Sequence, residues 1–108
     1  MSTFDDREKA FESRFSRDGD LGFKVAARRN KLLGLWAAEL MGITGDAANT
    51  YAGDVVKADL EEAGDEDVYR KVKGDLDAKG VDISEHRVRK AMDEYMEEAR
   101  VQIMEKGE

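Results

Sequence analysis

The stretch from Leu21 to Gly42, LGFKVAARRNKLLGLWAAELMG, contains the strongest structural signal in this 108-residue chain. Its apolar side chains recur every three or four residues, which is the period of an amphipathic α-helix. They occupy two adjacent stripes, Val25, Leu32, Leu35 and Trp36 on one and Ala26, Leu33, Ala37 and Met41 on the other. A face this broad predicts a helix over residues 21–41 that is buried on more than one side. Gly42 is a typical residue to end it.

Three further helical patterns follow, separated by glycine-containing turns. We expect helices at about residues 47–62, 66–79 and 85–105. Their expected N-terminal caps are Asp46 or Thr44, Asp65 and Ser84, respectively. The expected inward side chains are Ala48, Tyr51, Ala52, Val55, Val56, Leu60, Val68, Tyr69, Val72, Leu76, Val88, Ala91, Met92, Tyr95, Ala99 and Ile103. Connections of a few residues favour antiparallel neighbours. The sequence therefore predicts an all-α fold, a four-helix bundle over residues 20–106.

A short, very polar helix is predicted in front of the bundle, over residues 3–18. Phe4, Phe11 and Phe15 are spaced by seven and four residues, so they share one face of a helix. The sequence DGDLG at residues 18–22 places two glycines close together, and a break in the helix is expected there. These phenylalanines could fold back onto the bundle as part of its core. We favour the other interpretation, because an amphipathic helix with a few aromatic anchors is typical of a segment that fills a partner's groove. We therefore expect a mobile arm, residues 1–18, within a single domain spanning residues 1–108.

Composition and charge exclude several classes of function. The chain has no Cys, so it can hold neither a disulfide nor a thiolate metal site nor a cysteine nucleophile. Residues 1–36 carry a net charge of +2 and residues 37–108 carry −9, which is unsuited to nucleic acid. No apolar run approaches the ~18 residues of a membrane span, and the first residues lack the pattern of a signal peptide. A soluble, intracellular protein is expected, monomeric when free.

The sequence offers no convincing catalytic or metal-binding constellation. His86 is the single histidine and no Cys accompanies it, so a surface position is expected. The acidic segment at residues 75–86 departs from a calcium loop, because Lys79 and His86 occupy two of the ligand positions. The acidic residues at 61–67 are better explained as helix ends than as a cation site. We therefore predict no enzymatic activity, no catalytic residue, no metal and no resident cofactor.

The sharpest basic cluster is Arg28-Arg29-Asn30-Lys31. It could receive a phosphate group or an acidic surface of a partner. The sequence has no glycine-rich phosphate loop, so nucleotide binding would have to be unconventional. The alternative interpretation is the solvated face of a helix whose other side is apolar. Both interpretations stay open at this point.

Three segments of the chain resemble the zeta-subunit family, the small inhibitor subunits of the F-type ATP synthase of alpha-proteobacteria. They are TFDDREKAFE at residues 3–12, FKVAARRNKLLGLWAA at 23–38 and GDEDV at 64–68. The resemblance runs along nearly the whole chain, and residues 27–38 are its most specific part. It implies a four-helix bundle with an N-terminal inhibitory segment, and therefore an inhibitor of ATP hydrolysis.

In that family the inhibitory segment wedges into the catalytic head where the alpha, beta and gamma subunits meet. On this sequence the segment maps to residues 2–18, and the implied inhibitory residues are Phe4, Asp5, Asp6, Arg7, Phe11, Arg14 and Phe15. Some members are associated with adenine nucleotides, which would make ATP or ADP a regulatory ligand contacted by Arg28, Arg29 and Lys31. The resemblance also implies a cytoplasmic protein, peripheral to the inner membrane through the ATP synthase. The alternatives are a small nucleotide- or anion-binding regulatory protein without catalysis, and a helical scaffold module.

Overall fold

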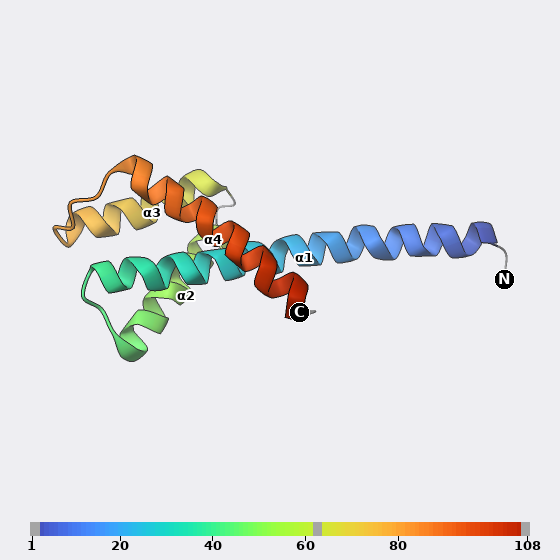
Figure 1. Ribbon diagram of the computed structural model, residues 1–108, viewed down its shortest axis with the longest axis horizontal. Coiled ribbons are helices and arrows are strands. Elements are labelled where there is room, and N and C mark those ends of the chain that lie inside the picture. Colours follow the sequence, from blue (N-terminus) through green and yellow to red (C-terminus); the bar gives the residue numbers. More distant parts are fainter. Residues whose placement is uncertain (1–2, 62–63, 107–108) are drawn as a thin grey trace.

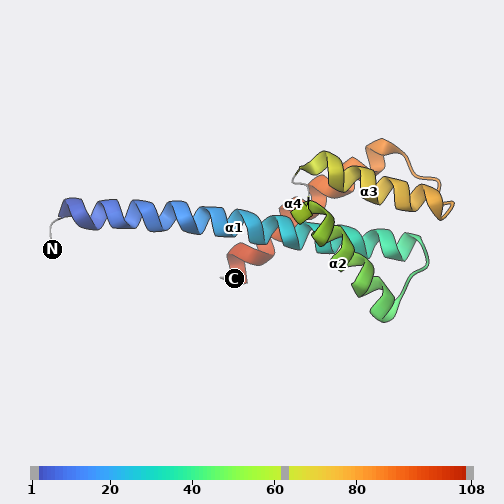
Figure 2. The same ribbon diagram turned by 180° about the vertical axis from the view of Figure 1, so that it is seen from behind.

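The computed structural model describes residues 3–61 and 64–106, which form four α-helices and, within these ranges, no strand. Helix α1 spans Thr3–Leu40, α2 Gly45–Glu61, α3 Asp65–Ala78 and α4 Glu85–Lys106. The other three helices gather around the second half of α1, while its first half projects away from them (Figure 1). The opposite view shows the same arrangement (Figure 2). The predicted all-α fold and the four helices of the bundle are confirmed.

Helix α1 sets the length of the molecule, which measures 63 × 26 × 22 Å. At a rise of about 1.5 Å per residue, a helix of this length extends about 57 Å. The predicted break at residues 18–22 is wrong, because these residues lie inside α1. A glycine weakens a helix by only about 1 kcal/mol relative to alanine, and no proline interrupts the hydrogen bonds. The arm and the first bundle helix are therefore one element.

Two helices end as their glycines predict. Gly42 after α1 and Gly80 after α3 have φ values of 77° and 78°, in the left-handed region. Directly after Gly80, the amide of Val81 donates to the carbonyl of Leu76 at 2.9 Å. At the end of α1, the amide of Ile43 donates in the same way to the carbonyl of Ala38 at 2.8 Å. This is the Schellman arrangement, which pairs carbonyl groups that the helix end leaves without a partner.

The predicted caps have different outcomes. The hydroxyl of Ser84 accepts a hydrogen bond from the amide of Arg87 at 3.1 Å, so the cap of α4 is confirmed. The cap predicted at Asp65 is wrong, because α3 begins at Asp65 and its N-cap is Gly64, with no side-chain cap hydrogen bond. The carboxylate of Asp65 points instead to Arg29 of α1, at 2.9 Å. The carboxylate of Asp65 therefore links α3 to α1 instead of capping its own helix.

The core lies where α1 meets the other three helices. The main cluster draws on all four and contains the buried side chains Leu33, Ala37, Val55, Val68, Val72, Leu76, Val88, Ala91 and Met92. A smaller cluster of Val25, Ala99 and Ile103 joins α1 to the end of α4. The predicted inward residues are buried or half-buried with one exception. Leu60 is 60% exposed, because it lies in the last turn of α2 at the rim of a hollow rather than in the core.

Helices α1 and α2 come into direct backbone contact at Gly34. A Cβ atom placed on Gly34 would lie 2.7 Å from the Cα atom of Ala52 and 3.2 Å from a methyl group of Val55. Real Cβ atoms do not approach a backbone so closely, so only glycine fits without movement of the helices. This contact explains a glycine in the middle of the strongest helical pattern of the chain.

Candidate functional site

The residues predicted to inhibit lie in the projecting half of α1. Their backbone belongs to the helix from Thr3 onward. Their side chains lie outside the described part of the structure, and these are Phe4, Asp5, Asp6, Arg7, Phe11, Arg14 and Phe15. In both views no other helix lies beside this half of α1 (Figures 1 and 2). The fold therefore presents residues 3–20 away from the bundle.

The basic cluster does not form one surface. Successive residues of a helix point about 100° apart, so Arg28, Arg29 and Lys31 cannot all face the same way. Arg29 is only 2% exposed and points into the protein, whereas Lys31 is exposed and Arg28 is half-buried. The guanidinium of Arg28 donates to Gln102 of α4 at 2.7 Å. The structure thus keeps Arg28 and Lys31 at the surface and removes Arg29 from it.

Arg29 belongs to a partly buried polar network that connects α1 to the end of α2 and the start of α3. Its Nε donates to the amide oxygen of Asn30 at 2.6 Å, and its terminal nitrogen donates to Asp65 at 2.9 Å. The amide nitrogen of Asn30, which is 1% exposed, donates to Asp59 at 2.9 Å. The second carboxylate oxygen of Asp59 accepts from the amide of Gly64 at 3.4 Å. Within the described residues the anion that Arg29 binds is therefore the protein's own Asp65.

The burial of Arg29 in this network could have been predicted from the sequence. Arg29 lies four residues after Val25 and four residues before Leu33, so it occupies the middle of the buried stripe. A charge at such a position is expected to be paired inside the protein rather than offered to a ligand. The partners, Asp59 and Asp65, come from distant positions that spacing does not reveal.

A groove lies beside the point where the arm meets the bundle, and we call it the root groove. It consists of two adjoining hollows of about 210 and 410 Å³ that share Phe23, Ala27 and Val56. Its lining also includes Lys24, Arg28, Lys31, Asp59, Leu60 and Ile103. Phe23 is 57% exposed there. Sequence reasoning did not single out Phe23 or Lys24, because their exposure depends on which helices cover α1.

A second polar cluster lies between α2 and α3. The hydroxyl of Tyr51 donates to Asp75 at 2.8 Å, and the ammonium of Lys71 lies 3.2 Å from the same oxygen. Burial, and then the hydrogen bond to Asp75, raises the pKa of Tyr51 above its ordinary value. The phenol therefore stays protonated and keeps its role as a donor. The cluster ties the two helices together.

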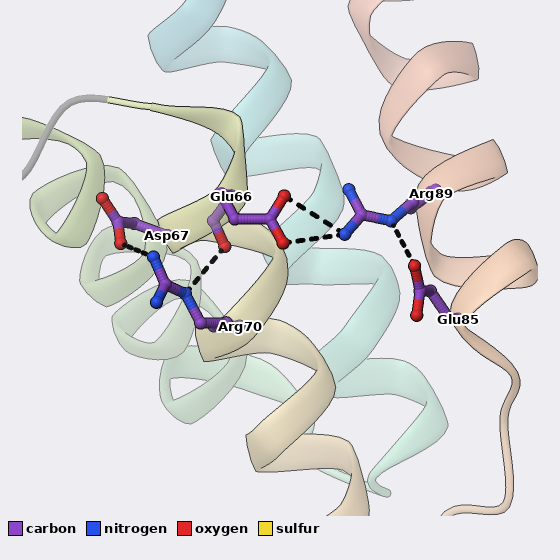
Figure 3. A network of polar contacts seen from close by, with 5 residues as sticks. All are labelled: Glu66, Asp67, Arg70, Glu85 and Arg89. Atoms are coloured by element: carbon purple, nitrogen blue, oxygen red, sulfur yellow. Dashed lines mark hydrogen bonds and ion pairs between the residues drawn. The ribbon is translucent and has the colours of Figure 1, made fainter.

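The surface contacts of α3 and α4 are ionic (Figure 3). Arg89 of α4 lies between Glu66 of α3 and Glu85 of its own helix, at 2.9 Å from each. Its guanidinium also lies 4.0 Å from the ring centre of Tyr69. Beside this group Arg70 pairs with Asp67 at 2.6 Å (Figure 3). The contacts of Arg89 with Glu66 and Tyr69 join α4 to α3, whereas the other ion pairs lie within one helix.

The described residues offer neither a metal site nor a membrane span. No group of three or more His, Cys, Asp or Glu side chains in this part of the chain is placed to hold a metal ion. None of the described helices combines the length and the apolar character needed to cross a membrane. His86 is exposed at the start of α4.

The fold and its surface define a small all-helical protein whose first helix projects from a bundle. The chain belongs to the family of ATPase inhibitor subunit zeta, whose family model matches residues 1–102. The resemblance noted in the sequence is thereby confirmed. A protein whose structure was solved by solution NMR is 56% identical in sequence to this chain. The match covers 78% of this chain and 95% of the chain in that structure, with a TM-score of 0.68. A comparison with curated protein sequences returned no match.

Proposed function

We propose that this chain inhibits ATP hydrolysis by the F-type ATP synthase by inserting residues 2–18 into the catalytic head, where the alpha, beta and gamma subunits meet. The observation that carries the proposal is the projecting half of α1 (Figure 1). Residues 3–20 extend about 27 Å at roughly 1.5 Å per residue, which is long enough to enter a cleft while the bundle stays outside. Membership of the inhibitor family supports the same target.

The register of α1 also supports insertion. Because α1 is one helix, positions in the arm can be compared directly with positions in the bundle. At about 100° per residue, Phe4 and Phe15 fall within about 20° of the direction of Leu33, a core residue. The aromatic stripe of the arm therefore continues the apolar stripe of the bundle. A helical segment with phenylalanines at such positions suits a groove on a partner.

We expect the full-length chain to inhibit ATP hydrolysis by the cognate catalytic head, and removal of residues 1–18 to abolish inhibition. The truncated chain keeps the core clusters, so its helical circular dichroism is expected to persist. The measurement is the rate of hydrolysis against the concentration of each chain. Equal inhibition by both chains would contradict insertion of the arm. No inhibition by either would contradict the proposed function.

A matched pair of substitutions sharpens this test. Phe11→Ala is expected to raise the half-inhibitory concentration at least about tenfold, because aromatic anchors often contribute about 2 kcal/mol or more to binding. Lys9→Ala is the control, since its position lies about 140° from that of Phe4 around the helix. It is expected to change the half-inhibitory concentration by less than about threefold.

A second candidate function is binding of an adenine nucleotide, ATP or ADP, in the root groove. The observation that favours it is the larger hollow of about 410 Å³, which brings Phe23 together with Lys24, Arg28 and Lys31. Small-molecule sites have volumes of roughly 300–1,000 Å³. The ring of Phe23 is available to stack on a base, and the cations suit phosphate oxygens. Arg29 is not part of this site, because it is buried against Asp65.

Titration with ATP, followed by the amide chemical shifts of the full-length chain, tests this candidate. Shifts are expected at residues 23–31 and at Val56. The double variant Lys24→Ala/Lys31→Ala is expected to weaken binding at least about 30-fold, because each phosphate contact to a charged group contributes roughly 1 kcal/mol or more. Shifts absent from these residues at millimolar ATP would exclude the groove as a nucleotide site.

A further inference from the structure

The root groove has an apolar floor that the protein leaves open. Phe23 of α1 is 57% exposed and Leu60 of α2 is 60% exposed. Both line the smaller hollow, together with Val56 and two alanines of α1. Two large apolar side chains beside one concave surface are a usual mark of a contact with another macromolecule. Their burial against an apolar partner surface would be favourable.

One flank of the groove is basic, although the protein as a whole is acidic. Lys24, Arg28 and Lys31 line the larger hollow. Residues 21–38 contain no Asp or Glu, whereas the whole chain has a net charge of −7. Among the described side chains that line the groove, one is acidic, Asp59, and its carboxylate already accepts hydrogen bonds from Asn30 and Gly64. The charge of this flank therefore favours an acidic partner.

The spacing of the cations fits a helical partner. Lys24 and Lys31 are seven residues apart on α1, which corresponds to two turns and about 10 Å along its axis. A helix lying along α1 would bring two of its own carboxylates, also about two turns apart, opposite these lysines. Apolar residues at intervals of three and four on the same helix would then cover Phe23 and Leu60.

We propose that the root groove docks an acidic amphipathic helix of the catalytic head. This inference rests on the proposed function and adds a second contact to it. Phe23 follows residue 18 by five positions in the same helix, so the groove lies at the base of the segment proposed to insert. Because both contacts lie on one helix, formation of one contact with the head raises the effective concentration for forming the other.

Charge reversal in the full-length chain tests the docking contact. Lys24→Glu/Lys31→Glu is expected to raise the half-inhibitory concentration at least about tenfold, because both partners would then be acidic. Maximal inhibition at saturating protein is expected to stay unchanged, since the arm is intact. Lys79→Glu/Lys90→Glu is the control, because both lysines are exposed, one directly after α3 and the other on α4, and the change in net charge is the same. Equal effects of the two double variants would overturn the proposal.

A photo-crosslinking residue in the full-length chain separates this proposal from the proposed function. Placed at Phe23, it is expected to cross-link to an acidic helical segment of the head, and placed at Phe11 it reports insertion of the arm. Cross-links from position 11 alone would overturn the docking groove and leave the proposed function standing. Cross-links from position 23 to a second copy of the chain, or to a segment without acids, would also overturn it. Cross-links from neither position would contradict both proposals.

Discussion

Replacement of Gly34 by alanine is expected to lower the free energy of unfolding by about 1–2 kcal/mol, and replacement by leucine by about 3 kcal/mol or more. Alanine adds a single atom, yet that atom would lie 2.7 Å from the Cα atom of Ala52. The clash is with backbone, so it can be relieved only if α1 and α2 move apart. The gain in helix propensity, about 1 kcal/mol, offsets only part of the loss.

Two other glycines provide the control for this experiment. Gly53 in α2 and Gly74 in α3 are also helical, but a Cβ placed on either would have no neighbour within 4 Å. Gly53→Ala and Gly74→Ala are therefore expected to stabilise the protein by about 0.4–1 kcal/mol each. Thermal unfolding followed by circular dichroism measures all four variants. A Gly34→Ala protein as stable as these controls would show that the helices do not touch there.

Replacement of Asn30 by leucine is expected to destabilise the protein by about 3 kcal/mol. Leucine has the same branching and the same number of side-chain heavy atoms, so no cavity is left. It removes the acceptor for the Nε of Arg29 at 2.6 Å and the donor to Asp59 at 2.9 Å. Arg29 is 2% exposed, so water cannot easily replace the lost partner. A buried charged donor would be left unsatisfied.

Asp65→Asn is the matched control for the same network. Its carboxylate also pairs with Arg29, at 2.9 Å, but the Asp65 side chain is 69% exposed. Asparagine keeps an oxygen that can accept the hydrogen bond from Arg29, and water reaches this exposed position, so the expected cost is smaller, about 1–2 kcal/mol. Urea unfolding can be followed by the fluorescence of Trp36, which lies 5.2 Å from the guanidinium of Arg87 and 6.5 Å from the ring of Tyr95. Equal losses in the two variants would assign the stabilisation to the ion pair rather than to Asn30.

The bundle was predictable because its signals are local. The three later helices lie within two residues of their predicted ends, since apolar period, glycine stops and the cap at Ser84 are all read over a few neighbouring residues. The continuity of α1 through residues 18–22 was not predicted, because two glycines weaken a helix by a small cost that the rest of the helix can outweigh. Leu60 fits the apolar period of α2, but the period does not say where the neighbouring helices end.

The candidate site was only partly predictable for the same reason. The sequence identified the basic cluster, but its division into buried Arg29 and surface-exposed Lys31 depends on where α2, α3 and α4 lie around α1. The pairing of Arg29 with Asp65 spans 36 positions, which spacing does not reveal. The root groove depends on three helices at once, so Phe23 carried no signal of its own. The inhibitory residues of the arm stay a prediction.

The continuity of α1 also fixes a rotational phase between arm and bundle. Each residue inserted between positions 18 and 23 would turn the arm by about 100° relative to the root groove, so its phenylalanines would face a different side of any partner. Seven inserted residues would restore the angle to within about 20° while lengthening the arm by about 10 Å. The junction therefore sets the angle at which the arm is presented as well as its reach. Variation in its length should be tolerated in steps of about two helical turns rather than of single residues.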